Sequence, residues 1–117
     1  MTTREEVDVF LRGFREKMNL WDVLFRDDRS KNTQTLADLE LRPVDRKKIL
    51  EKLEVEDYAQ GPLADTLYGE AAMWVFGKSV KKHEVYIKIT MGFRGGSVIC
   101  ISFHTAEHPM RYPFKES

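Results

Sequence analysis

Residues 84–103 read EVYIKITMGFRGGSVICISF, and this stretch determines the fold that we expect for the chain. Its first half alternates apolar with polar residues, setting Val85, Ile87 and Ile89 against Tyr86, Lys88 and Thr90. A period of two is typical of a strand with one buried face. Residues 97–103 instead form an apolar run, which favours a central strand buried on both faces. Between them, Gly95 and Gly96 accept positive φ, so the stretch predicts an antiparallel hairpin.

The flanking segments extend this sheet. Residues 73–76 (MWVF) have the composition of a further strand, so we expect an antiparallel sheet of three to four strands over residues 73–104. The tail over residues 105–117 contains Pro109 and Pro113. Because proline interrupts helices, we expect this tail to run extended over the surface.

The N-terminal half has helical periodicity. Thr2 or Thr3, followed three residues later by Glu5 or Glu6, has the spacing of a capping box, which predicts a helix over residues 3–19. One face of that helix is apolar: Val7, Phe10, Leu11, Phe14 and Met18. Thr33 is positioned to cap a short second helix, and Pro43 is at a favoured first position of a third. The third should bury Ile49, Leu50 and Leu53 and keep Arg46, Lys47, Lys48, Glu51 and Lys52 in water.

Two connecting segments carry other signals. Trp21, Val23 and Phe25 alternate within residues 20–31, which suits a short strand before a turn, and Trp21 is most simply a core residue. Residues 58–72 contain Gly61, Pro62 and Gly69 and are interpreted as a loop.

The predicted fold class is therefore α+β, with N-terminal helices packed on a C-terminal sheet in two layers. We expect a single domain over residues 1–117, with a helical part over 1–57, the loop over 58–72, the sheet over 73–104 and the extended tail over 105–117. A chain of 117 residues is long enough to bury a core of its own.

Charge is balanced overall but not locally. The chain has 19 basic and 19 acidic residues, which argues against a histone-like protein. Residues 1–76 carry 12 basic and 16 acidic groups, a balance of −4, whereas residues 77–117 carry 7 and 3, a balance of +4. The predicted sheet and tail are thus cationic, which permits a local RNA-binding face.

Other features bear on the compartment. Cys100 is the only cysteine, so the sequence excludes an internal disulfide and a cysteine-based zinc site. The N-terminus has charges scattered through its apolar residues, unlike a signal peptide, and no apolar run approaches the roughly 20 residues of a membrane span. We expect a cytoplasmic protein with no membrane partner and Cys100 as a small core residue.

The polar side of the predicted hairpin supplies the candidate site. If Val85 and its alternating partners face the helices, Tyr86 and Lys88 face away from them, and strand parity places His104 beside them. Histidine moves protons near neutral pH, a cation stabilises phosphate charge, and tyrosine offers a hydroxyl or a stacking ring. This set suits an RNA phosphodiester. The plainer alternative is the solvated face of a half-buried strand.

Basic residues on the flanking turns would steer RNA to this face: Lys81, Lys82 and Arg94. His104 and His108 are four residues apart, but Pro109 argues against the helix that such a metal pair needs, and no HExxH motif is present. We therefore predict no metal site and no cofactor.

The stretches VYIKIT and VICISF, together with LADLELRPVDRKKILEKLEVEDY and MWVF, resemble the MqsR family of toxins from bacterial toxin–antitoxin systems over residues 36–104. The resemblance implies a RelE-like α+β fold, metal-independent mRNA cleavage through the RNA 2′-hydroxyl, and inhibition by a cognate antitoxin. The catalytic tyrosine of the family corresponds to Tyr86 and its C-terminal catalytic lysine to His104. Two further functional positions, a lysine and a glutamine in the family, correspond to Ala59 and Val75, which cannot supply that chemistry.

Two functional hypotheses follow. In the first, the chain is a toxin and endoribonuclease in which Tyr86 and His104 handle protons, with His108 as a second proton carrier. Lys88 and Arg111 then stabilise the phosphate. In the second, the chain is a non-catalytic module that binds RNA or a protein partner through the same face.

Overall fold

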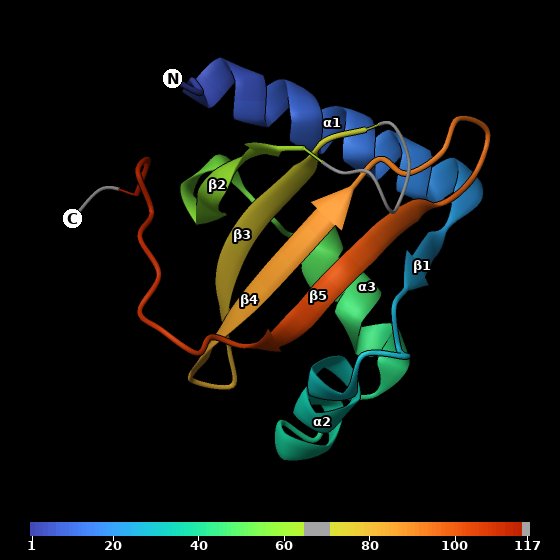
Figure 1. The fold of residues 1–117 in the computed structure, drawn as a ribbon, viewed down its shortest axis with the longest axis vertical. Coiled ribbons are helices and arrows are strands. Elements are labelled where there is room, and N and C mark those ends of the chain that lie inside the picture. Colours follow the sequence, from blue (N-terminus) through green and yellow to red (C-terminus); the bar gives the residue numbers. More distant parts are fainter. Residues whose placement is uncertain (65–70, 116–117) are drawn as a thin grey trace.

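A five-stranded mixed sheet forms the centre of the structure, with strand order β1-β5-β4-β3-β2 (Figure 1). The computed structural model describes residues 1–64 and 71–115. The strands are β1 (Val23–Phe25), β2 (Tyr58–Leu63), β3 (Met73–Val80), β4 (His83–Thr90) and β5 (Val98–Thr105). The helices are α1 (Arg4–Trp21), α2 (Ser30–Asp38) and α3 (Pro43–Glu51), and a 3-10 turn spans Val55–Asp57. The α+β class predicted from the sequence is confirmed.

The β3–β4–β5 meander is antiparallel as predicted, but the sheet is larger than the three to four strands expected. β1 pairs with β5 in parallel, so the sheet is mixed rather than antiparallel. The predicted loop over residues 58–72 is wrong at its start, where β2 forms an edge strand beside β3. Pro62 is compatible with that place because an edge strand needs no ladder hydrogen bond on its outer side. The rest of that prediction at residues 65–70 lies outside the described residues.

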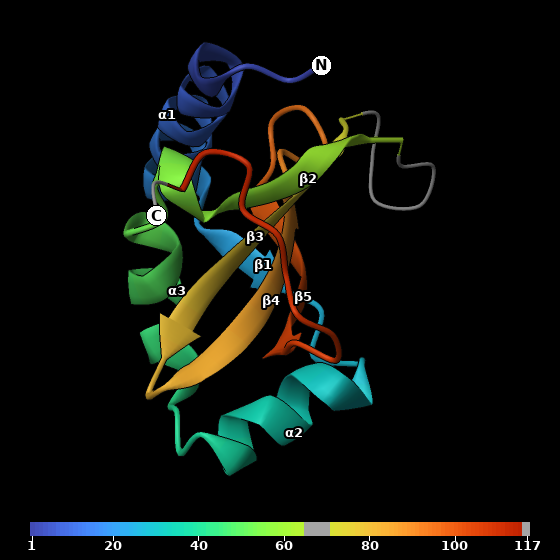
Figure 2. The same cartoon turned by 90° about the vertical axis from the view of Figure 1, so that its left-hand side faces the viewer.

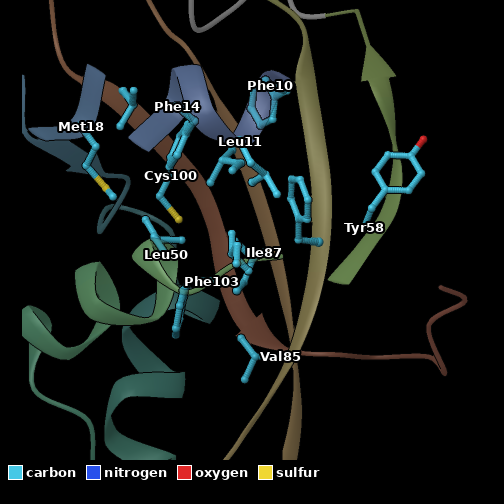
Figure 3. Close-up of a cluster of buried hydrophobic side chains, with 14 of the residues drawn as sticks. Phe10, Leu11, Phe14, Met18, Leu50, Tyr58, Val85, Ile87, Cys100 and Phe103 are labelled. Carbon is cyan, nitrogen blue, oxygen red and sulfur yellow. The ribbon is translucent and has the colours of Figure 1, made fainter. Parts of the chain in front are cut away.

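Helix α1 covers one face of the sheet, and its capping box between Thr3 and Glu6 is present. Its apolar stripe packs on the inward side chains of β4 and β5, among them Ile87, Cys100 and Phe103 (Figure 3). α3 lies on the same side (Figure 2) and contributes Leu50. All six residues from Val98 to Phe103 are buried, which confirms a two-sided central strand.

Some residue-level predictions for these helices are wrong. Trp21 ends α1 with 53% of its surface exposed, because the chain turns at Asp22 before β1 begins. α2 begins at Ser30 and its N-cap is Arg29 rather than Thr33. Arg46 was expected in water, yet it is buried. Its guanidinium donates two hydrogen bonds to Asp27, at 2.6 and 3.2 Å, and lies 3.9 Å from the centroid of the Phe25 ring.

Helix α2 takes the place of a neighbouring strand along the second half of β5. The buried Asn32 side chain donates to the Ile101 carbonyl at 3.0 Å and accepts from the Phe103 amide at 3.0 Å. Further along, the Thr105 amide donates to the Thr35 hydroxyl. Two side chains of α2 thus complete the backbone hydrogen bonding of β5 where β1 has ended, which satisfies buried backbone groups that would otherwise be costly.

The described part of the tail, residues 106–115, forms neither helix nor strand and runs from the end of β5 along the sheet towards β2 and the start of α1 (Figure 2). The Tyr112 hydroxyl donates to Glu84 at 2.7 Å, and burial and this carboxylate raise the pKa of Tyr112 above its usual value. Gly77 makes the crossing possible, because a Cβ there would overlap the Tyr112 hydroxyl. The Phe114 ring then stacks on Tyr58 at the sheet edge. No helix in the described part of the chain is long and apolar enough to cross a membrane.

Candidate functional site

Strand register brings Tyr86 and His104 together on the sheet face that points away from α1. Tyr86 pairs with His104 across β4 and β5, and Lys88 pairs with Ser102. The two rings are stacked, with centroids 5.2 Å apart and planes inclined by 14°. Three side chains therefore lie on this face together, as strand parity predicted: Tyr86, Lys88 and His104.

This pair lies in an open groove of about 400 Å³ that is bounded by β4, β5, the residue before α2 and the start of the tail. Its polar lining consists mainly of ionisable side chains: Arg29, Tyr86, Lys88, His104, Glu107 and His108. The groove thus combines two imidazoles, a phenol and two cations, which are groups that can transfer protons and bind a phosphodiester.

One hydrogen bond defines the tautomer of His104. Its Nδ1 lies 3.0 Å from the Thr105 carbonyl oxygen. A carbonyl can only accept, so Nδ1 carries the proton and donates it. In the neutral ring Nε2 is then the acceptor, which is the form that a general base needs.

Tyr86 remains a neutral phenol at physiological pH. Burial raises the pKa of its hydroxyl, and the positive charge of Arg29 opposes this shift. The ammonium of Lys88 lies 5.9 Å from the centroid of the Tyr86 ring. Tyr86 is therefore suited to donating a proton rather than to accepting one.

Glu107 supplies a negative charge at the rim of the groove. A hydrogen bond from Lys31 lowers the pKa of this carboxyl, and the fields of His104 and His108 lower it further. The ion pair between Lys31 and Glu107 also joins α2 to the tail at this point.

The predicted RNA-steering residues do not gather at the groove. Lys81 and Lys82 form the tight turn between β3 and β4, and the Lys81 ammonium donates to the Glu40 carbonyl. Arg94 lies in the hairpin at the opposite end of β4. Arg111 is an exposed tail residue outside the groove lining. His108, by contrast, lines the groove as the tail passes His104.

Ala59 and Val75, the two positions at which the resemblance predicts a loss of functional residues, both lie in the sheet. Ala59 is a half-buried residue of β2, and Val75 is buried on β3 opposite Lys88. Neither side chain can transfer a proton or bind a phosphate. Any chemistry at this face therefore depends on β4, β5, Arg29 and the tail.

Sequence reasoning missed Arg29 and Glu107 as groove residues. Arg29 is far from β4 in sequence and reaches it only because β1 and α2 pack beside β5. The one available signal was charge, since Arg29 ends the charged stretch RDDR. Among the described residues, no group of three or more His, Cys, Asp and Glu side chains could hold a metal ion.

A second hollow of about 340 Å³ adjoins the groove beside α2. It lies between the exposed side of α2 and the end of β5, and His104 and Glu107 line both spaces.

Comparison with known proteins gives no relatives: no family model, curated protein or solved structure matches this chain.

Proposed function

We propose that the groove binds RNA and cleaves it by internal transesterification, as in the metal-independent endoribonuclease toxins of the MqsR and RelE type. The observation that carries this proposal is the stacked Tyr86–His104 pair, which lies in one groove with two cations and a second histidine. Acid–base groups and cations in one groove are what cleavage of a phosphodiester requires.

The reaction follows from the protonation states of the two rings. Nε2 of His104 accepts the proton of the ribose 2′-hydroxyl as its oxygen bonds to phosphorus. The bond from phosphorus to the 5′ oxygen breaks, and the Tyr86 hydroxyl donates its proton to that leaving oxygen. His108 is the second candidate for this proton. The products are a 2′,3′-cyclic phosphate and a 5′-hydroxyl.

Positive charge in the groove would stabilise the extra negative charge on the phosphate as the 2′ oxygen bonds to phosphorus. Arg29 and Lys88 both line the groove, Arg29 just before α2 and Lys88 on β4 two residues after Tyr86. Both can face the phosphate oxygens, where negative charge increases as the new bond forms. In this proposal Arg29 takes the part that the sequence suggested for Arg111.

In its cellular setting the protein would be a cytoplasmic toxin held inactive by a cognate antitoxin. The open groove and the cationic balance of residues 77–117 support an acidic inhibitor that covers the same face. We propose no cofactor.

A second candidate, an RNA-binding module that does not cut, is favoured by the apolar Val75 beside Lys88. An aromatic ring and cations in a groove also suffice for binding single-stranded RNA.

Inducible expression in bacteria tests the toxin proposal. Wild-type protein is expected to arrest growth and fragment mRNA, whereas the Tyr86→Phe variant, expressed to the same level, should permit growth because the proton donor is lost. The readouts are the growth curve and the lengths of a reporter mRNA. Unaffected growth and intact mRNA with the wild-type protein would contradict the proposal.

A further inference from the structure

The hollow between α2 and the end of β5 suits a nucleobase. Its volume of about 340 Å³ is within the range of roughly 300–1,000 Å³ that small ligands occupy. It meets the catalytic groove at His104 and Glu107, which line both spaces. A nucleotide whose phosphate lies at His104 can therefore place a neighbouring base beside α2.

The side chains of α2 that line this hollow are polar. Gln34 and Asp38 are one helical turn apart, and Nε2 of Gln34 donates to Oδ1 of Asp38 at 2.8 Å. A carboxylate only accepts, so this contact determines which end of the Gln34 amide faces Asp38. The amide is thereby held by its neighbour on the same helix.

This hydrogen bond occupies one of the two N–H groups of Gln34. Gln34 and Asp38 are exposed, and within the described part of the chain Gln34 makes no other side-chain hydrogen bond, so its second N–H and its Oε1 face solvent and are available to a ligand. An amide that presents a donor and an acceptor side by side is the group that reads adenine, by bonding to its N6 and N7 atoms. The other polar side chain nearby, Thr35, is already used, because its hydroxyl donates to Lys31 and accepts from Thr105.

We propose that this hollow is an adenine-selective subsite for the base that flanks the scissile phosphate, with Gln34 as the specificity-determining residue and Asp38 as its positioning residue. This inference rests on the proposed function, which supplies RNA as the ligand and places the scissile phosphate at His104. In this proposal Gln34 selects the nucleobase and takes no part in proton transfer.

The test is the binding of short 2′-O-methyl RNAs, which cannot be cleaved through a 2′-hydroxyl. Fluorescence anisotropy would compare oligonucleotides that differ at one position by adenine, guanine, cytosine or uracil. Wild-type protein is expected to bind the adenine oligonucleotide about tenfold more tightly than the others. The Gln34→Ala variant should lose this preference and retain the weaker binding of the other three.

Gln60→Ala is the matched control, because Gln60 is an exposed glutamine on β2, away from α2. It should keep the adenine preference. A wild-type protein that binds all four oligonucleotides equally would overturn the subsite while leaving the cleavage proposal intact. Persistence of the preference in Gln34→Ala would also overturn it. Failure to bind any of the four would contradict the subsite and RNA recognition by the groove together.

Discussion

The His104→Ala variant is expected to cleave RNA roughly 10²–10⁴-fold more slowly than the wild-type protein, the usual effect of removing a general base. The loss should be in the chemical step. Because the Thr105 carbonyl keeps the ring proton on Nδ1 of His104, Nε2 is the ring nitrogen that can accept the proton of the 2′-hydroxyl. Arg29 and Lys88 remain to bind the phosphates, so RNA affinity should change much less. Single-turnover cleavage of a labelled RNA measures the rate, and anisotropy measures the affinity.

His83→Ala is the control for this experiment, since His83 is exposed in the tight turn at the start of β4 and is not part of the groove. It should cleave at the wild-type rate. Thermal unfolding of both variants shows whether the fold is retained, because His104 also stacks on Tyr86. A His104→Ala variant that cleaves as fast as wild type would remove His104 from the mechanism.

The Asn32→Leu variant is expected to lower the free energy of unfolding by about 2–4 kcal/mol. Leucine has the same branching and the same number of side-chain heavy atoms as asparagine, so the change removes the hydrogen bonds without opening a cavity. The Ile101 carbonyl and the Phe103 amide would then be buried at the edge of β5 with no partner from α2. Each unsatisfied buried group costs roughly 1–3 kcal/mol.

Urea unfolding followed by circular dichroism measures this loss. Asn19→Leu is the matched control, because Asn19 is an exposed residue of α1, and we expect it to change stability by less than about 0.5 kcal/mol. If Asn32→Leu also changed the free energy of unfolding by less than about 0.5 kcal/mol, the hydrogen bonds from α2 to β5 would not stabilise the fold as we infer.

The sequence predicted the central meander well because its signals are local. Alternation over β4 identified the buried and exposed faces of that strand, and the apolar run identified β5 as a central strand. Alternation at the end of β5 then placed His104 on the face of Tyr86, because its neighbour Phe103 faces the core. Counting residues from the turn would have failed, because the β4–β5 register shifts between Lys88 and Ile89.

Long-range packing could not be predicted in the same way. The parallel pairing of β1 with β5 depends on contacts between residues more than 70 positions apart, such as Val23 with Val98. That pairing also brings Arg29 to the groove. The sequence therefore failed to predict the parallel strand pairing and the groove cation for the same reason. Arg46 was misassigned because helical periodicity does not show that Asp27 would pair with it.

Cleavage of a DNA oligonucleotide that contains a single ribonucleotide tests the central claim most directly, because that substrate has one 2′-hydroxyl. The ribonucleotide should be an adenosine, and the reaction should be followed by mass spectrometry of the fragments. We predict one cut, directly 3′ of the ribonucleotide, with a 2′,3′-cyclic phosphate on one fragment and a 5′-hydroxyl on the other. An uncut substrate under conditions in which the protein binds it, or cuts at deoxynucleotides, would contradict the account.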